Sequence, residues 1–328
     1  MIVITGGAGF IGSNLVAALQ DRGEDTLVVC DRLGHGDKWR NLGKRELAAL
    51  LPPEALFEFL ARHAREIDTV FHLGAVSSTT ETDADLVIAA NFTLSQRLWD
   101  WCADSETRLL YASSAATYGD GSAGFDDDGS VAGLARLAPL NAYGWSKHLF
   151  DRRIARLVEG HAKQPAQWVG LKFFNVYGPN EYHKGAMRSV VAQIEPRAAR
   201  GEPARLFRSH RDGVPDGGQK RDFVYVGDCV DMMLWLYDHP SVSGLFNIGS
   251  GSARSFAELA AAVYRALGRE PSIEFVDTPA EIRDRYQYFT EARMERLRAA
   301  GYDRPMTPLE DGVRDYVQRY LAAADPYR

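Results

Sequence analysis

The chain has 328 residues, a formal net charge of -6 and a hydrophobic fraction of 45%, as expected for a globular protein with one large or two interlocked domains. No apolar run approaches the roughly 20 residues that cross a bilayer, and the acidic balance argues against non-specific binding of nucleic acid. The three cysteines, Cys30, Cys102 and Cys229, are widely spaced, which excludes a disulfide framework and a thiolate zinc site. They fit a reducing compartment, so we expect a cytoplasmic protein.

The first half of the chain alternates short β-branched runs with helical stretches. Residues 2–5 form the first such run, a glycine cluster follows, and residues 10–19 have the apolar spacing of a helix. Further strands are expected at 26–30, 69–73, 108–112 and 169–174. Strands that alternate with helices predict an α/β fold with a Rossmann-type doubly wound parallel sheet, which binds ligands beyond the carboxyl ends of its strands.

The second half is less regular and predicts a smaller, discontinuous α/β substrate-binding domain. Helices are expected at 186–200, from 228, at 255–267 and at 309–321, strands at 223–226, 245–248 and 272–276, and a polar loop at 208–219. The expected dinucleotide-binding domain spans 1–174 with returns at about 222–249 and 286–298, and the substrate-binding domain spans 175–221, 250–285 and 299–328. Asp126–Asp128 is interpreted as a solvated loop, and no metal site is expected.

Three glycines, Gly6, Gly9 and Gly12, lie between the first predicted strand and helix. Glycine permits a tight turn and a close backbone approach to a diphosphate, which the free N–H groups at the helix start can bind. Asp31 ends the next predicted strand, 19 positions after Gly12, where a dinucleotide site needs an acidic residue for the ribose. This context predicts a bound dinucleotide rather than an ordinary strand–helix turn.

The residues around the end of the second strand bear on the choice between NAD and NADP. Asp31 can accept hydrogen bonds from a ribose diol, which favours NAD. Arg32 and Lys38 could each neutralise a 2′-phosphate, which favours NADP, although both are also ordinary surface charges. We expect NADP, with NAD as the alternative.

Tyr143 and Lys147 are four residues apart in a predicted helix, so they share one face. An ammonium beside a phenol stabilises the phenolate and makes tyrosine usable as a base near neutral pH. The spacing alone is a weak signal, because a chain with 14 tyrosines yields such pairs by chance. Ser113 and Ser114 strengthen it, since they follow the strand at 108–112 at the sheet edge where the cofactor is expected.

With these motifs the chain resembles the extended short-chain dehydrogenase/reductase family over nearly its whole length. The matching segments are Gly6–Gly12, Gly74-Ala75, Asn91, Ser114, Tyr143-x-x-x-Lys147 and Asn175–Pro179. Most members of that family act on nucleotide-activated sugars. Within it, a second set of segments resembles the ADP-heptose 6-epimerases: Ser77–Glu81, Ala112–Gly119, His183–Gly185, Lys220–Asp228 and Arg285–Gln287.

The resemblance implies that bound nicotinamide oxidises C6 of an ADP-activated heptose to a ketone and reduces it again on the other face. Tyr143 and Lys184 would transfer protons on opposite faces, and Ser114 would orient the oxygen. Lys147 would hold the nicotinamide ribose and tune Tyr143. Lysine can lose its proton, whereas arginine in practice cannot. Because the chain has seven lysines against 31 arginines, lysine at these two positions favours chemistry over simple charge.

The resemblance also implies two sets of binding residues and an assembly. The cofactor set is Gly6, Gly9, Phe10, Ile11, Gly12, Asp31, Arg32, Lys38, Leu73, Gly74, Ala75, Ser77, Asn91, Lys147, Val176 and Lys184. The substrate set is Ser114, Asn175, Ala186, Gln193, Phe207, Arg221 and Tyr286. Of these, Arg221 and Tyr286 would contact the ADP part and Asn175 the sugar. The family further implies a homo-oligomer, specifically a pentamer.

Four departures from the family pattern leave the exact sugar nucleotide open. Ala186 stands where the family has serine, Gln193 where it has histidine, and Arg32 where asparagine is usual, while the loop at 208–219 is longer. Three of these changes concern the substrate pocket and one concerns the cofactor pocket. The predicted fold and hydride chemistry do not depend on them.

Three other functions compete with the heptose epimerase. A UDP-hexose 4-epimerase uses the same Ser/Tyr/Lys set but has no need for Lys184, and it is the runner-up. A nucleotide-sugar 4,6-dehydratase needs an acidic pair where Ala115 and Ala116 stand. A non-catalytic dinucleotide sensor typically loses the tyrosine or the lysine, and this chain keeps both.

Overall fold

The structure is a computed structural model that describes residues 1–279, 283 and 287–328. Its largest unit is a seven-stranded parallel sheet in the order β10-β6-β5-β4-β1-β2-β3. The strands are β1 (Ile2–Thr5), β2 (Leu27–Cys30), β3 (Ala49–Leu51), β4 (Thr69–His72), β5 (Arg108–Ser114), β6 (Trp168–Phe173) and β10 (Gly244–Ile248). The five strands predicted in the first half are confirmed, and the strand predicted at 245–248 extends the same sheet.

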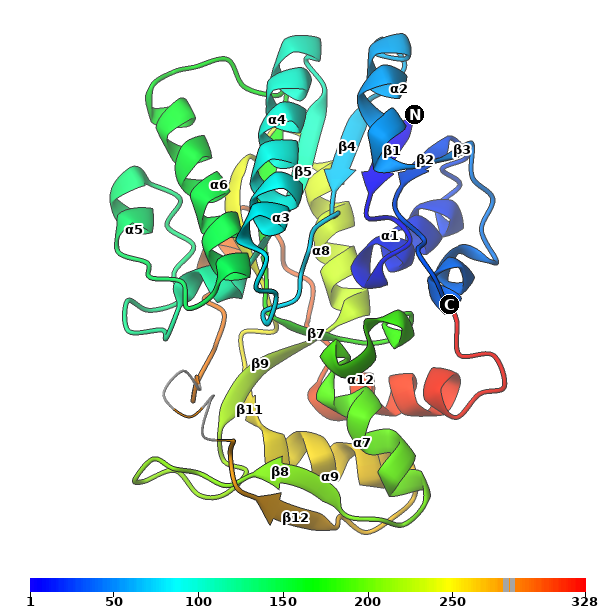
Figure 1. Cartoon of the computed structure of the whole chain (residues 1–328), viewed down its shortest axis with the longest axis vertical. Coiled ribbons are helices and arrows are strands. Elements are labelled where there is room, and N and C mark those ends of the chain that lie inside the picture. Colours follow the sequence, from blue (N-terminus) through cyan, green and yellow to red (C-terminus); the bar gives the residue numbers. More distant parts are fainter. Residues whose placement is uncertain (280–282, 284–286) are drawn as a thin grey trace.

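Helices cover both faces of this sheet (Figure 1), because successive side chains of a buried strand point to opposite faces. Ile2 and Ile4 of β1 belong to one apolar core with residues of α1 and α8. Val3 belongs to a second core with residues of α2, α4 and α6. These helices are α1 (Phe10–Asp21), α2 (Leu56–Arg62), α4 (Leu94–Ser105), α6 (Ala142–Glu159) and α8 (Val226–Asp238). The predicted doubly wound α/β fold is confirmed.

A smaller part lies below the large sheet in Figure 1 and has its own sheets and core. One sheet has the order β11-β9-β7, and β8 pairs with β12. Its elements are β7 (Asn175–Tyr177), α7 (Val190–Ala199), β8 (Ala204–Phe207), β9 (Lys220–Tyr225), β11 (Ala253–Ser255), α9 (Phe256–Ala266), β12 (Ile273–Val276) and α12 (Leu309–Tyr316). β9 pairs outside the large sheet, whereas β10 returns to it. The division into two domains at the stated boundaries stays a prediction.

Short helical segments lie between or after the longer elements, and two of the predicted helices have different bounds in the structure. They are η1 (Asp37–Leu42), η2 (Pro53–Ala55), α3 (Ala84–Ile88), η3 (Ala89–Thr93), η4 (Ala115–Tyr118), α5 (Val131–Ala135), η5 (Tyr182–Met187), α11 (Glu295–Ala299) and η6 (Val317–Leu321). The helix predicted at 186–200 begins only at Val190, because the Ser189 side chain caps it there. The helix predicted at 309–321 changes to a π-helical turn at Val317. The loop predicted at 208–219 is confirmed.

The acidic loop Asp126–Asp128 is solvated, as expected, at Asp126 and Asp128 but not at Asp127. Asp127 is only 5% exposed and accepts a hydrogen bond from the backbone N–H of Asn247 on β10, at 2.8 Å. Among the residues that the structure describes, no three His, Cys, Asp or Glu side chains gather as they would around a metal ion. Asp127 therefore ties this loop to the edge strand of the sheet.

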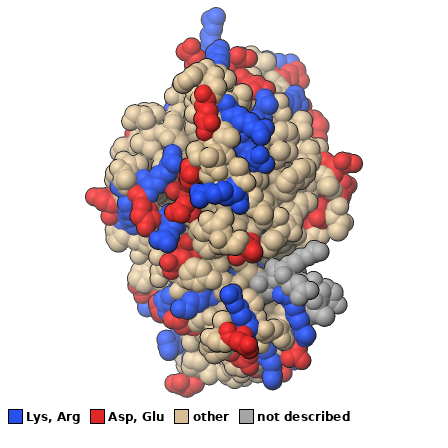
Figure 2. Space-filling model, turned by 90° about the vertical axis from the view of Figure 1, so that its left-hand side faces the viewer, with Lys and Arg blue, Asp and Glu red and all other residues tan. Residues whose placement is uncertain are grey.

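Two further observations concern the surface and membrane association. In residues 1–279, 283 and 287–328, no helix has both the length and the apolar character of a membrane span. On the face shown in Figure 2, positive and negative side chains are interspersed over both the larger and the smaller part. This distribution agrees with the modest net charge of -6.

Candidate active site

The turn between β1 and α1 is a close-packed backbone site. Gly6 has a φ of +70°, and a Cβ there would lie 2.5 Å from the backbone nitrogen of Gly74. A Cβ on Gly12 would lie 2.2 Å from the Gly6 carbonyl oxygen. Gly9, at the N-cap, has no side chain that could occupy the first N–H groups of α1. These groups are therefore open to an anion such as the diphosphate of a dinucleotide, which the turn fits.

Asp31, directly after β2, is held beside this turn. Its Oδ2 accepts the backbone N–H of Ala8 at 2.9 Å, and its Oδ1 accepts Lys38 Nζ at 2.7 Å. The Arg32 guanidinium instead pairs with Glu54, and its side chain is 69% exposed. Of the two cations weighed for a 2′-phosphate, Lys38 thus lines the cavity beside the turn, whereas Arg32 does not.

A cavity of about 310 Å³ begins at the glycine turn and runs along the carboxyl ends of the strands. It brings together the following predicted residues: Gly6, Gly9, Phe10, Ile11, Gly12, Asp31, Lys38, Leu73, Gly74, Ala75, Ser77, Ser114, Tyr143, Lys147, Val176 and Lys184. The predicted residues outside its lining are Arg32, Asn91, Asn175, Ala186, Gln193, Phe207 and Arg221. Tyr286 lies outside the described residues.

The start of α6 brings Tyr143 next to Ser114. The Asn141 side chain caps the helix by accepting the N–H of Gly144 at 2.8 Å. A Cβ on Gly144 would lie 2.7 Å from the Ala116 carbonyl oxygen, so glycine lets the helix approach the turn that follows Ser114. Burial raises the pKa of Tyr143, and its hydrogen bond with Ser114 acts in the opposite direction.

Lys147 lies one helical turn after Tyr143 and is 3% exposed. Burial lowers its pKa to about 8, because a low-dielectric site disfavours the charged form. An ammonium in this position stabilises a neighbouring phenolate, which makes the pair able to exchange a proton with a substrate hydroxyl.

Lys184 enters the cavity from the smaller part of the molecule, on η5. Gly185, with a φ of +55°, forms the kink that follows it. Lys184 Nζ lies 5.2 Å from the centroid of the Phe10 ring at the start of α1. Burial lowers the pKa of this lysine. The cavity is thus lined by a tyrosine from α6 and by a lysine from η5, both able to transfer protons.

Asn91 supports the cavity from behind. Its side chain bonds both backbone groups of Val76, at 2.8 and 2.9 Å, and its Nδ2 donates to Ser146 Oγ at 3.0 Å. Ser146 Oγ in turn donates to the Tyr143 carbonyl at 2.7 Å. Asn91 therefore joins the segment beside the cavity to the helix that carries Tyr143.

The predicted substrate residues are more scattered. Gln193 and Phe207 line a second cavity of about 400 Å³, together with Phe256. The guanidinium of Arg221 lies 5.6 Å from the centroid of the Phe256 ring. Ala186 is exposed and accepts Gln193 Nε2 through its carbonyl at 3.2 Å, and Asn175 is exposed on β7.

Residues outside the predicted catalytic and binding sets also line the main cavity: Ala112, Ser113, Phe173, Phe174, His183 and Met187. His183 faces Asn41 Nδ2, 3.2 Å from its Nδ1. The position of His183 beside Lys184 in the His-Lys-Gly segment could have indicated that it lines the cavity. The two phenylalanines lie at the end of β6 and gave none, because an apolar residue at a strand end is typical of the core.

Residues 325–328, which we call the clasp, join η1 to η5. On the η1 side, the Arg40 guanidinium lies 4.7 Å from the centroid of the Tyr327 ring. On the η5 side, Tyr182 packs edge-on against Tyr327, with 5.3 Å between ring centroids. Lys38 lies on η1 and Lys184 on η5, so the clasp holds together the two segments that bring these lysines to the cavity.

Comparison with known proteins places the chain in a family. Residues 2–249 match the model of the NAD dependent epimerase/dehydratase family. The ADP-L-glycero-D-manno-heptose-6-epimerase of Nitratidesulfovibrio vulgaris (strain DP4) is 48% identical over an alignment of 329 positions, which covers 100% of each chain. The protein of that name from Fusobacterium nucleatum is 45% identical over an alignment of 335 positions, which again covers 100% of each chain.

Solved structures agree with this match. The crystal structure of Helicobacter pylori ADP-L-glycero-D-manno-heptose-6-epimerase aligns with a TM-score of 0.80 and 30% identity, covering 98% of this chain and 96% of that one. Thermus thermophilus UDP-glucose 4-epimerase in complex with NAD aligns with a TM-score of 0.75 and 25% identity, covering 98% and 99%. The chain belongs to the NAD dependent epimerase/dehydratase family.

Proposed function

We propose that the chain is an ADP-L-glycero-D-manno-heptose-6-epimerase, which inverts C6 of the heptose in ADP-D-glycero-D-manno-heptose. Relatives of that name match its whole length at 48% and 45% identity. The observation that carries the proposal is that Tyr143, Lys184 and the glycine turn line one cavity. Inversion of a carbinol carbon needs proton-transfer groups that reach both faces of the sugar beside a bound dinucleotide.

The proposed mechanism divides the work among four side chains. A nicotinamide held beside the glycine turn and Lys147 would supply the reversible hydride transfer that oxidation of C6 to a ketone and its reduction on the other face require. Tyr143 exchanges the hydroxyl proton on one face while the Ser114 hydroxyl orients the substrate oxygen. The Lys147 ammonium holds the nicotinamide ribose and favours the phenolate form of Tyr143. Lys184, whose pKa is lowered by burial, exchanges the proton on the other face.

NADP is the proposed cofactor. The Asp31 carboxylate already accepts Lys38 Nζ at 2.7 Å, the Arg32 N–H at 2.7 Å and the Ala8 N–H at 2.9 Å. Its charge is therefore compensated, which weakens its repulsion of a 2′-phosphate, and Lys38 supplies a cation beside it. NAD is favoured by the name of the family and by the NAD complex of the Thermus relative.

Mass spectrometry of the nucleotide that copurifies with the protein tests this choice. We expect NADP, and a Lys38→Ala variant should lose affinity for NADP about tenfold more than for NAD, because one ion pair to phosphate disappears. An Arg32→Ala variant is the matched control, since its guanidinium is held by Glu54 outside the cavity. Copurified NAD, with no change in preference in the Lys38 variant, would contradict the proposal.

The remaining predicted residues are proposed to bind the substrate. Gln193 and Phe207 would contact the nucleotide in the second cavity, and Arg221 would contact the diphosphate. Ala186 and Asn175, both exposed, and Tyr286 are proposed on family resemblance alone. Cytoplasmic location is proposed because the three cysteines are free and buried. A homo-oligomer, a pentamer by resemblance, is proposed as well, and light scattering would test it.

Incubation of the holoenzyme with ADP-D-glycero-D-manno-heptose, followed by NMR, tests the activity directly. We expect the second C6 epimer to appear, and Tyr143→Phe and Lys184→Met to lower the rate by about 10²–10⁴-fold, the usual contribution of a general acid–base. Lys163→Met, at an exposed surface lysine, is the matched control. Absence of the second epimer would refute the proposal, and conversion of UDP-glucose instead would favour the 4-epimerase.

A further inference from the structure

Lys172 is a buried lysine that the proposed mechanism leaves unused. It lies on β6 with 0% side-chain exposure, and its Nζ is 3.0 Å from Asp151 Oδ2, whose side chain is also 0% exposed. Burying two charges is costly, and an apolar pair of similar volume is often equally or more stable. Stability alone therefore does not explain why an ion pair occupies this place in the core.

Both charges reach the turn that carries Ser114. Asp151 Oδ2 accepts the Ser113 hydroxyl at 2.6 Å. Lys172 Nζ donates to Thr117 Oγ1 at 2.6 Å, and Thr117 Oγ1 donates to the Ser114 carbonyl at 2.7 Å. The ion pair thus fixes the backbone on either side of the Ser114 hydroxyl, at the junction of β5 and η4.

Asp151 also faces the proton-transfer pair. It lies on α6, four residues after Lys147 and eight after Tyr143, so the three side chains share one face of the helix. The negative charge of Asp151 raises the pKa of Lys147 and of Tyr143. It therefore opposes the burial that lowers the pKa of Lys147 to about 8.

We propose that Asp151 is a positioning residue for the epimerase reaction: paired with Lys172, it fixes the turn that carries Ser114 and keeps the Lys147 side chain an ammonium. The inference rests on the proposed function in assigning the chemistry to Ser114, Tyr143 and Lys147. Asp151 acts through these groups and does not line the cavity itself.

Other titratable groups face this cluster and enter its electrostatics. The positive charge of Lys147 also acts on His72 of β4. In the described part of the chain, the groups that interact with Asp151 or Lys172 are Tyr111, Tyr118, Asp127 and His148, and the charge of Arg152 acts on His148. Among the described groups, Asp151 is the one carboxylate whose charge acts on both Tyr143 and Lys147.

The pH profile of epimerisation by the holoenzyme tests the proposal. Asp151→Asn keeps an oxygen acceptor for Ser113 and removes the charge. Removing that charge lowers the pKa of Tyr143 and of Lys147, so both limbs of the profile should move to lower pH, by about one unit. At about pH 9, above the pKa of Lys147 in both proteins, we expect kcat to fall about tenfold with KM nearly unchanged, because a one-unit shift lowers the ammonium fraction about tenfold there. A profile with unshifted limbs, whatever the loss of rate, would overturn the proposal.

A double variant keeps the proposal testable if the Asp151→Asn protein does not fold. Asp151→Asn leaves Lys172 buried without its partner, which destabilises the core. Asp151→Asn combined with Lys172→Met removes both charges, so no unpaired charge remains. Asp151 supplies the coulombic contribution to the pKa of Lys147, so the double variant should fold and keep a shift to lower pH. The shift should be smaller than in the single variant, because the opposing positive charge of Lys172 is removed as well. If it folds with the pH profile of the unaltered protein, the ion pair is merely structural.

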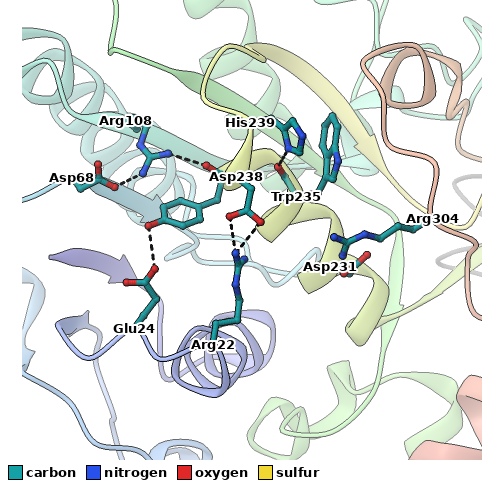
Figure 3. A network of polar contacts seen from close by, with 10 residues as sticks. Arg22, Glu24, Asp68, Arg108, Asp231, Trp235, Asp238, His239 and Arg304 are labelled. Atoms are coloured by element: carbon teal, nitrogen blue, oxygen red, sulfur yellow. Dashed lines mark hydrogen bonds and ion pairs between the residues drawn. The ribbon is translucent and has the colours of Figure 1, made fainter.

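Asp238→Asn is the matched control. Asp238, at the end of α8, accepts two hydrogen bonds from Arg22, at 2.7 and 2.8 Å. It belongs to a polar network at the end of the sheet where β4 and β5 begin. The same network contains the ion pair between Asp68 and Arg108 (Figure 3). This end of the sheet is opposite the carboxyl ends of the strands, where the cavity lies. Removal of the Asp238 carboxylate should therefore leave the pH profile of epimerisation unshifted.

A readout without substrate separates this inference from the proposed function. The pH dependence of Lys147 acylation by a small anhydride, followed by peptide mass spectrometry, reports the neutral amine directly. Labelling of Lys147 should begin at lower pH in Asp151→Asn than in the unaltered protein. If ADP-heptose is not epimerised and the labelling still shifts, the proposed function fails and the link from Asp151 to Lys147 stands. Unshifted labelling would refute that link.

Discussion

Acidification should destabilise the fold through two buried histidines. His72 and His148 are 1% and 4% exposed. Burial lowers the pKa of His72 to about 3, with the charge of Lys147 acting in the same direction, and lowers the pKa of His148 to about 4. Both are therefore neutral in the folded protein under conditions in which the unfolded chain, with a histidine pKa of about 6.5, begins to bind protons.

The sign and size follow from proton linkage. Because the unfolded state binds more protons below about pH 6.5, the free energy of unfolding falls as the pH drops through that value towards the folded pKa. At about pH 5, one and a half units below the unfolded pKa, each neutral histidine costs about 2 kcal/mol relative to pH 7.5. His72 and His148 together should cost about 4 kcal/mol.

Urea unfolding near pH 7.5 and pH 5 measures this loss. His148 is suited to substitution, since its Nδ1 is buried without a hydrogen-bond partner in the described part of the chain. His148→Leu should lose about 2 kcal/mol less than the unaltered protein between the two pH values. His35→Gln, at an exposed position, is the control. Carboxylates titrate in the same range, so the difference between proteins is the informative quantity. An equal loss in His148→Leu would refute the reasoning.

Three further predictions concern the cofactor site and the core. Gly12→Ala should weaken dinucleotide binding at least about tenfold by calorimetry, because its Cβ would lie 2.2 Å from the Gly6 carbonyl oxygen; unchanged affinity would contradict this account of the turn. Tyr327→Ala should raise the cofactor Kd by about three- to tenfold through the loss of one aromatic and one cation–π contact, whereas Tyr327→Phe, which keeps both, should not. Lys172→Met alone should cost about 3–5 kcal/mol of unfolding free energy, and adding Asp151→Asn should recover most of it; no recovery would mean that the two charges are not coupled.

The large sheet could be predicted from the sequence because each strand is an apolar, β-branched run between turn signals. Ile2–Thr5 is such a run, and its alternate residues enter two separate cores. β3 was missed because Ala49–Leu51 has three residues and none of them is buried. Its pairing with β2 is set by the neighbouring strand rather than by its own composition.

The candidate site was predictable to the extent that short motifs carry it. The glycine turn and the Tyr143/Lys147 pair have fixed spacings, and they line one cavity. The different surroundings of Arg32 and Lys38 could not be read from the sequence, because the ion pair of Arg32 with Glu54 depends on tertiary placement. The same holds for Lys172, whose partner Asp151 lies 21 residues away on another element. When the partner of a buried charge is distant in the chain, the residues next to that charge do not indicate that it is buried.

Retention of the proposed dinucleotide depends on the clasp, which lies far along the chain from the glycine turn. Tyr327 touches η1 through Arg40 and η5 through Tyr182, and a ligand held between these segments restrains the same parts. By reciprocity, whatever free energy the docked clasp contributes to ligand binding, the ligand returns to the docking of the clasp. Ligand release and undocking of residues 325–328 are then coupled equilibria. The rate at which a protease cleaves these residues should therefore fall as the fraction of ligand-bound protein rises.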